Sequence, residues 1–428
     1  MKTVPILVRW SPLGPHRPEG GPPHAARQPT RPRLRRLRPP GVEEGTVTLP
    51  VVIVAGLHAD ARRATVDALL RAVPGSVALH HDLVGAAGGT VRRELRDRDG
   101  TVAEASAPLV NDCACCALRE DLLPELERLA DAPELTRLAV VELWDSVEPA
   151  SVARLLAARD ERRLSLVGVV TAVDPALVLP ALATGDDLAE VGLSAALGDN
   201  RTVGDTFARQ LEYAPVLALV EGETPPDAAD RALLAQLHPL ARVTGPADPA
   251  FARVVTAGFD AAAAASRVDP ATALLPQEAT AEGVTTHVWS ARRPFHPDRL
   301  HAALPELACA ALRSRGRFWL ADRFDTLLSW DATGGALCVA GHGRWLASLP
   351  EADWPEVPAA RRAAAAVDWD PHHGDRGQHL VFTSPDLDVP ALRAVLGSCL
   401  LTDDEHAKGP MVWACRGSAF DGLLDAAS

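Results

Sequence analysis

The sequence predicts a two-domain protein, in which a mostly parallel α/β sheet with helices on both faces is followed by a smaller α+β domain. Between residues 47 and 245, apolar β-branched segments alternate with segments of helical periodicity. This alternation is typical of a parallel sheet covered by helices. A stretch rich in alanine, proline and acidic residues at 246–282 predicts a linker, and a second set of strands and helices follows at 283–418.

The first domain starts abruptly after residue 46. The apolar run 47–56 ends in glycine and predicts a buried strand that meets a turn, and the spacing of residues 61–72 predicts a helix. A second strand is expected just before His80. The same patterns predict further strands at 138–143, 164–173 and 216–220 and a helix at 149–158.

The second domain shows shorter strands and two clear helices. Within the preceding linker, residues 261–265 predict a short helix. In the domain itself, strands are expected at 285–290, 337–340 and 379–383, and helices at 297–312 and 388–399.

Residues 1–46 are rich in proline, arginine and glycine and show no apolar periodicity. This composition predicts a disordered basic extension. Its arginines could contact acidic partners, but a dispensable extension explains the segment equally well. We therefore assign it no function, and the sequence does not tell whether it belongs to the native protein.

Composition excludes several classes of function. The formal net charge of −13 argues against a nucleic-acid-binding surface, which would need clustered Lys and Arg. No apolar run reaches the roughly 18 residues that cross a bilayer, so no membrane partner is expected. The seven cysteines are odd in number and mostly isolated, which indicates a reducing compartment. We expect a cytoplasmic protein.

Three of those cysteines, Cys113, Cys115 and Cys116, lie within four residues. Thiolates at this spacing can converge on a soft ion such as zinc or copper(I). The alternative is that they are small buried residues at a strand-to-helix junction. His80 and His81 could complete a tetrahedral zinc site, or they could be surface histidines without a metal. A second candidate cluster is formed by His372, His373 and His379.

The predicted strand, glycine and helix near Gly56 are the setting of a phosphate-binding loop. The residues that such a loop needs are replaced: Ala61 stands at the second glycine, Arg62 at the lysine and Arg63 at the hydroxyl that holds magnesium. An alanine strains the loop, and the lost hydroxyl removes a metal ligand. A structural helix start, weak nucleotide binding and retained hydrolysis all remain open.

Taken together, these segments resemble the CobW-like P-loop GTPases. In the first domain the resemblance rests on the loop at 51–65, the C-x-C-C cluster followed by Arg119 and Asp121-Leu122, and the acidic strand end at Glu142. Four ordered motifs of the CobW C-terminal domain recur at 293–300, 313–320, 374–382 and 400–405. The resemblance covers about residues 50 to 410.

The resemblance implies a metallochaperone in which GTP controls metal transfer. It implies that Gly56, Ala61, Arg62 and Arg63 lie at the phosphates, and that Glu142 lies close to magnesium or the metal, although Glu142 could equally be a packing acid. The guanine-reading N-K-x-D motif appears as residues 220–223, where only the acid Glu223 is kept. GTP and magnesium are therefore doubtful cofactors.

Our hypothesis from the sequence is a zinc-handling protein in which the cysteine cluster holds the ion and the C-terminal domain engages a client metalloprotein. A divergent GTPase is one alternative, and a non-enzymatic pseudo-GTPase scaffold is another. The sequence does not identify the client or choose zinc over cobalt. It also leaves the oligomeric state open, including a homo-oligomer.

Overall fold

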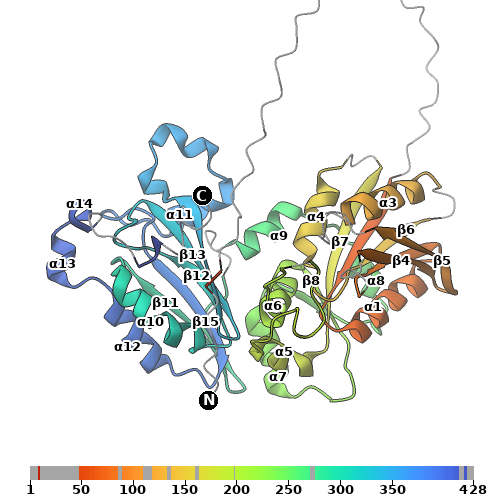
Figure 1. Cartoon of the computed structure of the whole chain (residues 1–428), viewed down its shortest axis with the longest axis horizontal. Helices are drawn as coiled ribbons and strands as arrows, with labels where there is room; N and C mark the ends of the chain where they lie inside the picture. Colours follow the sequence, from red (N-terminus) through yellow and green to blue (C-terminus); the bar gives the residue numbers. More distant parts are fainter. Residues whose placement is uncertain are drawn as a thin grey trace, which may run out of the picture.

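The computed structural model describes residues 8–9, 48–84, 89–108, 118–132, 136–159, 163–196, 198–269, 275–413 and 419–421. Two sheets, each with its own helices, lie side by side in the molecule (Figure 1). Among the described helices, none is both long enough and apolar enough to cross a membrane.

The first sheet has eight strands in the order β5-β4-β3-β6-β2-β7-β8-β9. All neighbours from β3 to β9 run parallel, whereas β4 and β5 form an antiparallel hairpin at one edge. The predicted, mostly parallel sheet is therefore confirmed. Its strands are β2 (Leu49–Ala55), β3 (Ser76–Asp82), β4 (Thr90–Asp97), β5 (Gly100–Pro108), β6 (Leu138–Glu142), β7 (Leu164–Val173), β8 (Val216–Leu219) and β9 (Arg242–Thr244).

Helices cover both faces of this sheet, because its central strand is apolar on both sides. In β2, Val51 and Ile53 face one core while Val52 and Val54 face the other, and all four are fully buried. Such two-sided burial is typical of a parallel strand. The covering elements are α1 (Ala59–Ala72), the π-helical turn η2 (Leu118–Leu122), α3 (Leu123–Ala130), α4 (Pro149–Ala157), η3 (Pro175–Leu177), α5 (Val178–Ala183), α6 (Val203–Tyr213) and α7 (Ala228–Leu237).

The stretch expected to be a linker contains two helices, α8 (Phe251–Val255) and α9 (Ala261–Val268). Phe251 of α8 is buried in the core that includes α1, and Ala264 of α9 is buried in the core on the opposite face. Gly168 permits this packing, since a Cβ there would lie 2.0 Å from the carbonyl oxygen of Val255. The chain stays packed against the first domain as far as α9.

The second sheet is antiparallel except at one edge, where β1 runs parallel to β14. Its order is β1-β14-β13-β12-β15-β11-β10. The smaller α+β domain is therefore confirmed. Its strands are β1 (Val8–Arg9), β10 (Ala279–Ala281), β11 (Val284–Ala291), β12 (Arg313–Phe318), β13 (Thr326–Thr333), β14 (Ala336–Arg344) and β15 (Gln378–Pro385). Its helices are α10 (Pro297–Cys309), α11 (Ala359–Val367), α12 (Val389–Cys399), α13 (Asp403–Ala407) and α14 (Pro410–Trp413), with the 3-10 turns η4 (Leu346–Ser348) and η5 (Glu351–Glu356).

The two faces of the second sheet differ in chemistry. The outer face carries large apolar side chains such as Phe318 and Trp330, which pack with α10 and α12. The inner face carries Arg313, Arg315 and Arg317, because alternate residues of β12 point to the same side. Helix α6 of the first domain lies toward this inner face (Figure 1). The domains thus meet across a polar surface at α6, while Leu234 of α7 shares a buried apolar cluster with Val284 and Leu312 of the second domain.

A buried ion cluster joins the two domains. Glu212, at the end of α6, accepts two hydrogen bonds from Arg313, at 2.8 and 3.0 Å, and one from Arg315 at 2.9 Å. Arg313 also pairs with Asp331 of β13. Burial would raise the pKa of Asp331, but the charges of Arg313 and Arg209 lower it to about 2. Each carboxylate is therefore held ionised against the second sheet.

His238 ends α7 and is a buried neutral histidine. The residue is 6 % exposed, and its Nε2 donates to the carbonyl oxygen of Ala214 at 2.9 Å. Burial lowers the pKa of His238 to about 4. Because the folded pKa lies below the unfolded value of 6.5, this group favours folding above pH 6.5 and loses that contribution as the pH falls toward 4.

We predict that His238→Gln reduces the acid sensitivity of the fold. Glutamine keeps a donor for Ala214 but takes up no proton, so the loss in free energy of unfolding between about pH 7 and pH 4.5 should shrink by about 2 kcal/mol. Urea unfolding followed by tryptophan fluorescence at both pH values measures this. The matched control is His372→Gln at an exposed site, and an equal effect of both substitutions would contradict the assignment.

Candidate functional site

The candidate site lies where the parallel strands end. The segments after β2, β6, β7 and β8 come together at this edge of the sheet, where α/β proteins place their ligand sites. Gly56 follows β2 with φ of 140°, and a Cβ there would lie 2.4 Å from the carbonyl oxygen of Ala172 in β7. Only glycine fits this close approach, which explains why Gly56 is present in an otherwise altered loop.

The loop between β2 and α1 is very short. Helix α1 begins at Ala59, so only three residues, Gly56, Leu57 and His58, separate strand from helix. The backbone N–H of Arg62 donates to the carbonyl oxygen of His58 at 3.1 Å, and Ala61 is buried within the first turn. The residues that would form a phosphate cradle are thus already part of the helix.

Arg62 turns into the protein. It is 2 % exposed, and its guanidinium donates to the carbonyl oxygen of Gly56 at 2.6 Å and pairs with Asp145, which follows β6. Gln210 of α6 donates to the backbone oxygen of Asp145 at 2.7 Å. The cation at the position of the expected lysine therefore serves an internal ion pair. The next residue, Arg63, is exposed to solvent.

His58 closes the loop from the side of α6. It is the N-cap residue of α1, but its side chain makes no capping hydrogen bond to the helix. Its ring contacts the ring of Phe207 edge-on, with 5.3 Å between the ring centroids. Burial lowers its pKa, opposed by the charge of Asp174. Asp174, at the end of β7, accepts from the backbone N–H of Ala176 at 3.1 Å. An imidazole and an ion pair thus occupy this edge.

The two acids named from the sequence have different surroundings. Glu142 ends β6, is 5 % exposed, and accepts from Arg96 of β4 at 3.2 Å. Arg96 also binds Asp67 of α1, so the carboxylate of Glu142 belongs to a buried ion cluster that links strands and helix. Glu223 follows β8 and is exposed.

His80 and His81 lie within β3 rather than after it. Consecutive residues of a strand point to opposite faces, so the two rings lie on different sides of the sheet. His80 Nδ1 lies 3.0 Å from the backbone oxygen of Glu142. His81 is 3 % exposed, and its Nε2 lies 2.7 Å from Asp121 of η2. The hydrogen bond from His81, together with the charge of Arg93, lowers the pKa of Asp121.

The three clustered cysteines, Cys113, Cys115 and Cys116, lie outside the described residues. They belong to the chain between β5 and η2, and η2 begins at Leu118, whose side chain is buried. In the part of the chain that is described, no three His, Cys, Asp or Glu side chains are arranged to hold a metal ion. This statement includes His372, His373 and His379.

Sequence reasoning missed Asp145 and Arg96, the partners of Arg62 and Glu142. Asp145 lies 83 positions from Arg62, and Arg96 lies 46 positions from Glu142. The available signal for Asp145 was its position three residues after Glu142, the acid that ends β6. A buried partner for an arginine can be chosen only when strand order is known.

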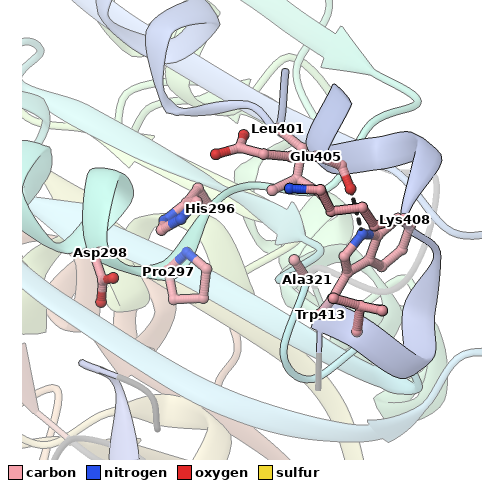
Figure 2. A pocket seen from close by; sticks show the side chains of 9 residues that line it. His296, Pro297, Asp298, Ala321, Leu401, Glu405, Lys408 and Trp413 are labelled. Carbon is pink, nitrogen blue, oxygen red and sulfur yellow. Dashed lines mark hydrogen bonds between the residues drawn. The ribbon is translucent and has the colours of Figure 1, made fainter. Parts of the chain in front are cut away.

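The C-terminal domain has a small hollow of about 40 Å³ between the start of α10 and helices α13 and α14 (Figure 2). His296, the N-cap residue of α10, and Lys408 line it together with Trp413. Trp413 Nε1 donates to the backbone oxygen of Glu405 at 2.8 Å, which fixes α14 over the hollow. This space suits one side chain rather than a free ligand.

Both domains match known families. Residues 93–242 match the CobW/HypB/UreG nucleotide-binding domain, and residues 284–400 match the cobalamin synthesis protein cobW C-terminal domain. The first match begins beyond the loop at Gly56. With this domain pair and the similarity to whole relatives described next, the chain belongs to the CobW family.

Two curated relatives cover most of the chain. A Mycobacterium tuberculosis protein (strain ATCC 25618 / H37Rv) named Zinc chaperone Rv0106 is 32 % identical over 384 residues, which is 85 % of this chain and 90 % of that protein. Zinc-regulated GTPase metalloprotein activator 1 of Dictyostelium discoideum is 26 % identical over 330 residues, 72 % of this chain and 69 % of that protein. Among solved structures, zinc-bound YjiA GTPase from E. coli aligns at 14 % identity and a TM-score of 0.34, covering 83 % of this chain and 100 % of that one.

We predict that Arg62→Met destabilises the protein strongly. The substitution leaves the carboxylate of Asp145 without its buried partner, which costs about 3 to 5 kcal/mol of unfolding free energy. Urea unfolding measures the effect. Arg63→Met, the neighbouring exposed residue on the same helix, should change stability by less than about 0.5 kcal/mol. Similar values for both variants would show that Arg62 is not held internally.

Proposed function

We propose that this chain is a zinc chaperone of the CobW class that holds the ion through Cys113, Cys115 and Cys116. The observation that carries the proposal is the C-x-C-C cluster in a chain that aligns along 85 % of its length with a relative named as a zinc chaperone. Thiolates bind zinc strongly, and three protein ligands leave a fourth position open for exchange. An open position suits a protein that passes its ion on.

The described residues support an anchored cysteine segment. Leu118 and Leu122 of η2 are buried, and Asp121 between them is bonded to His81 of β3 and Arg93 of β4. Because η2 starts two residues after Cys116, these contacts would fix one end of the metal-binding segment. We assign His81 to positioning through Asp121, and we leave His80 and His81 out of the ligand set.

We further propose that the nucleotide switch is degenerate. Three features support this: the three-residue loop, the use of Arg62 in a pair with Asp145, and the family match that begins only at residue 93. A phosphate loop works by pointing free backbone N–H groups and a cation at the phosphates. Here the cation is neutralised internally, so GTP and magnesium would have to break a buried ion pair.

A divergent GTP-binding protein is the second candidate. The observation in its favour is Gly56, which keeps the strand, glycine and helix arrangement at the expected edge of the sheet.

We propose that a client metalloprotein docks on the C-terminal domain. The hollow beside His296 and Lys408 would receive one of its side chains.

We predict that the reduced, metal-free protein binds one zinc ion tightly. Replacing Cys113, Cys115 and Cys116 together by serine should weaken zinc binding by more than about 100-fold, because losing even a residue that only supports a ligand lowers metal affinity about 10- to 100-fold. Titration against a chromophoric chelator measures this. Cys309→Ser, at an exposed free cysteine of α10, is the matched control. Unchanged zinc affinity in the triple variant would refute the metal assignment.

We also predict that GTP with magnesium leaves the zinc affinity unchanged and that no phosphate is released, because Arg62 is held by Asp145. The test is zinc titration with and without the nucleotide, together with a phosphate-release assay. Phosphate release that requires magnesium would favour the second candidate. That outcome would leave the zinc assignment untouched.

A further inference from the structure

A cavity of about 540 Å³ lies between the two domains, away from the strand ends that form the candidate site. One wall is the inner face of the second sheet, and the other walls come from α4, α6 and α9 of the first domain. The figure shows α9 lying between the domains (Figure 1). The volume of the cavity falls within the range of pockets that bind small molecules, about 300 to 1,000 Å³. Such pockets often lie at domain interfaces.

Arg313 and Arg315 of β12 form part of the cavity wall, and the three arginines of this strand differ in how fully they are bonded. Arg313 is saturated by Glu212, Asp331 and two backbone oxygens. Arg317 pairs with Asp368. Arg315, between them, makes one hydrogen bond within the described residues, to Glu212 at 2.9 Å, although a guanidinium carries five N–H donors.

The electrostatics agree with this geometry. Arg315 is 8 % exposed, and burial lowers its pKa, because Glu212 offsets only part of the cost. The pKa of Arg313 is instead raised, because Asp331 and Glu212 together outweigh its burial. Glu212 is shared by both cations. Of the two buried arginines that share Glu212, Arg315 is therefore the one whose charge is less compensated.

A second cation reaches the cavity from the first domain. Arg154 of α4 lines the cavity, is exposed, and forms no ion pair with any described residue. The wall contains four acids, and each has a partner. Glu148 pairs with Arg201 and Arg209, and Asp331 pairs with Arg313. Glu212 pairs with Arg313 and Arg315, and Asp269 lies 3.9 Å from His342. Arg154 and Arg315 thus keep donors that no carboxylate of the wall occupies.

We propose that this interdomain cavity binds a small organic anion, whose carboxylate or phosphate group is held by Arg315 and Arg154. Arginine recognises both groups through paired N–H donors. Ala265 and Val268 of α9 line the same cavity and provide apolar contacts for a short carbon skeleton. Because the two cations belong to different domains, the bound anion would bridge the domains. The site needs neither zinc nor GTP, so it goes beyond the function proposed above.

The test is isothermal titration of the full-length, metal-free protein at constant ionic strength with two probes, inorganic pyrophosphate and glutarate. We expect saturable one-to-one binding of at least one probe. Arg154→Ala should weaken it about tenfold, the value of one hydrogen bond to a charged group. Arg159→Ala, an exposed arginine just beyond α4 that does not line the cavity, should leave the affinity unchanged. Binding of pyrophosphate alone assigns the site to phosphates, and binding of glutarate alone assigns it to carboxylates.

Arg315 is tested with Arg315→Lys, because lysine keeps the charge beside Glu212 but lacks the paired donors. We expect a lower probe affinity with an unchanged urea midpoint. If this variant does not fold, the comparison of probe affinity between Arg154→Ala and Arg159→Ala still tests the proposal. The proposal is overturned if neither probe binds, or if Arg154→Ala and Arg159→Ala bind equally. It is also overturned if Arg62→Ala, shown by tryptophan fluorescence to be folded without urea, abolishes pyrophosphate binding while Arg154→Ala does not, which would place the anion at the loop after β2.

Discussion

The arrangement of this molecule depends on Glu212, a single buried carboxylate that pairs with two arginines of the other domain. A sheet packed on both sides usually buries apolar residues on both faces, but β12 places Arg313 and Arg315 inward. Buried cations without partners are very costly, so this face requires an acid opposite it. The end of α6 supplies that acid, and Asp331 supplies a second from within the sheet. Charge pairing at α6 therefore joins the domains beside an apolar cluster in which Leu234 of α7 packs with Val284 and Leu312.

The same constraint governs the strand ends of the first domain. Arg62 is buried beside Gly56 and needs a counter-ion, which Asp145 provides. The segment that carries Asp145 continues to Glu148, which pairs with Arg201 and Arg209, and Arg209 reaches Asp331 of the second sheet at 3.6 Å. Two groups of ion pairs, joined by the backbone between Asp145 and Glu148, thus extend from the loop after β2 to the C-terminal domain. An internal ion pair thus lies at the edge of the sheet where Gly56 follows β2.

Several elements were predictable because their signal is local. The apolar runs of β2, β6 and β7 and the periodic helices α1, α4 and α12 lie where their patterns place them. The hairpin of β4 and β5 was missed, since β4 carries Arg92, Arg93, Glu94 and Arg96 and β5 is exposed along most of its length. Such strands are defined by pairing with a neighbour, which no local pattern reports. The pairing also places His80 and His81 inside β3, on opposite faces of the sheet.

The sequence by itself determined the CobW resemblance, the two-domain α/β and α+β plan, the C-x-C-C cluster and the altered phosphate loop. Each of these features depends on residues that are close together in the chain. Tertiary structure decided which charges meet. Arg62 finds Asp145 across 83 positions, and Arg315 finds Glu212 across 103. Burial makes every such cation depend on a partner, and strand order, which brings distant positions together, selects the acid that neutralises it.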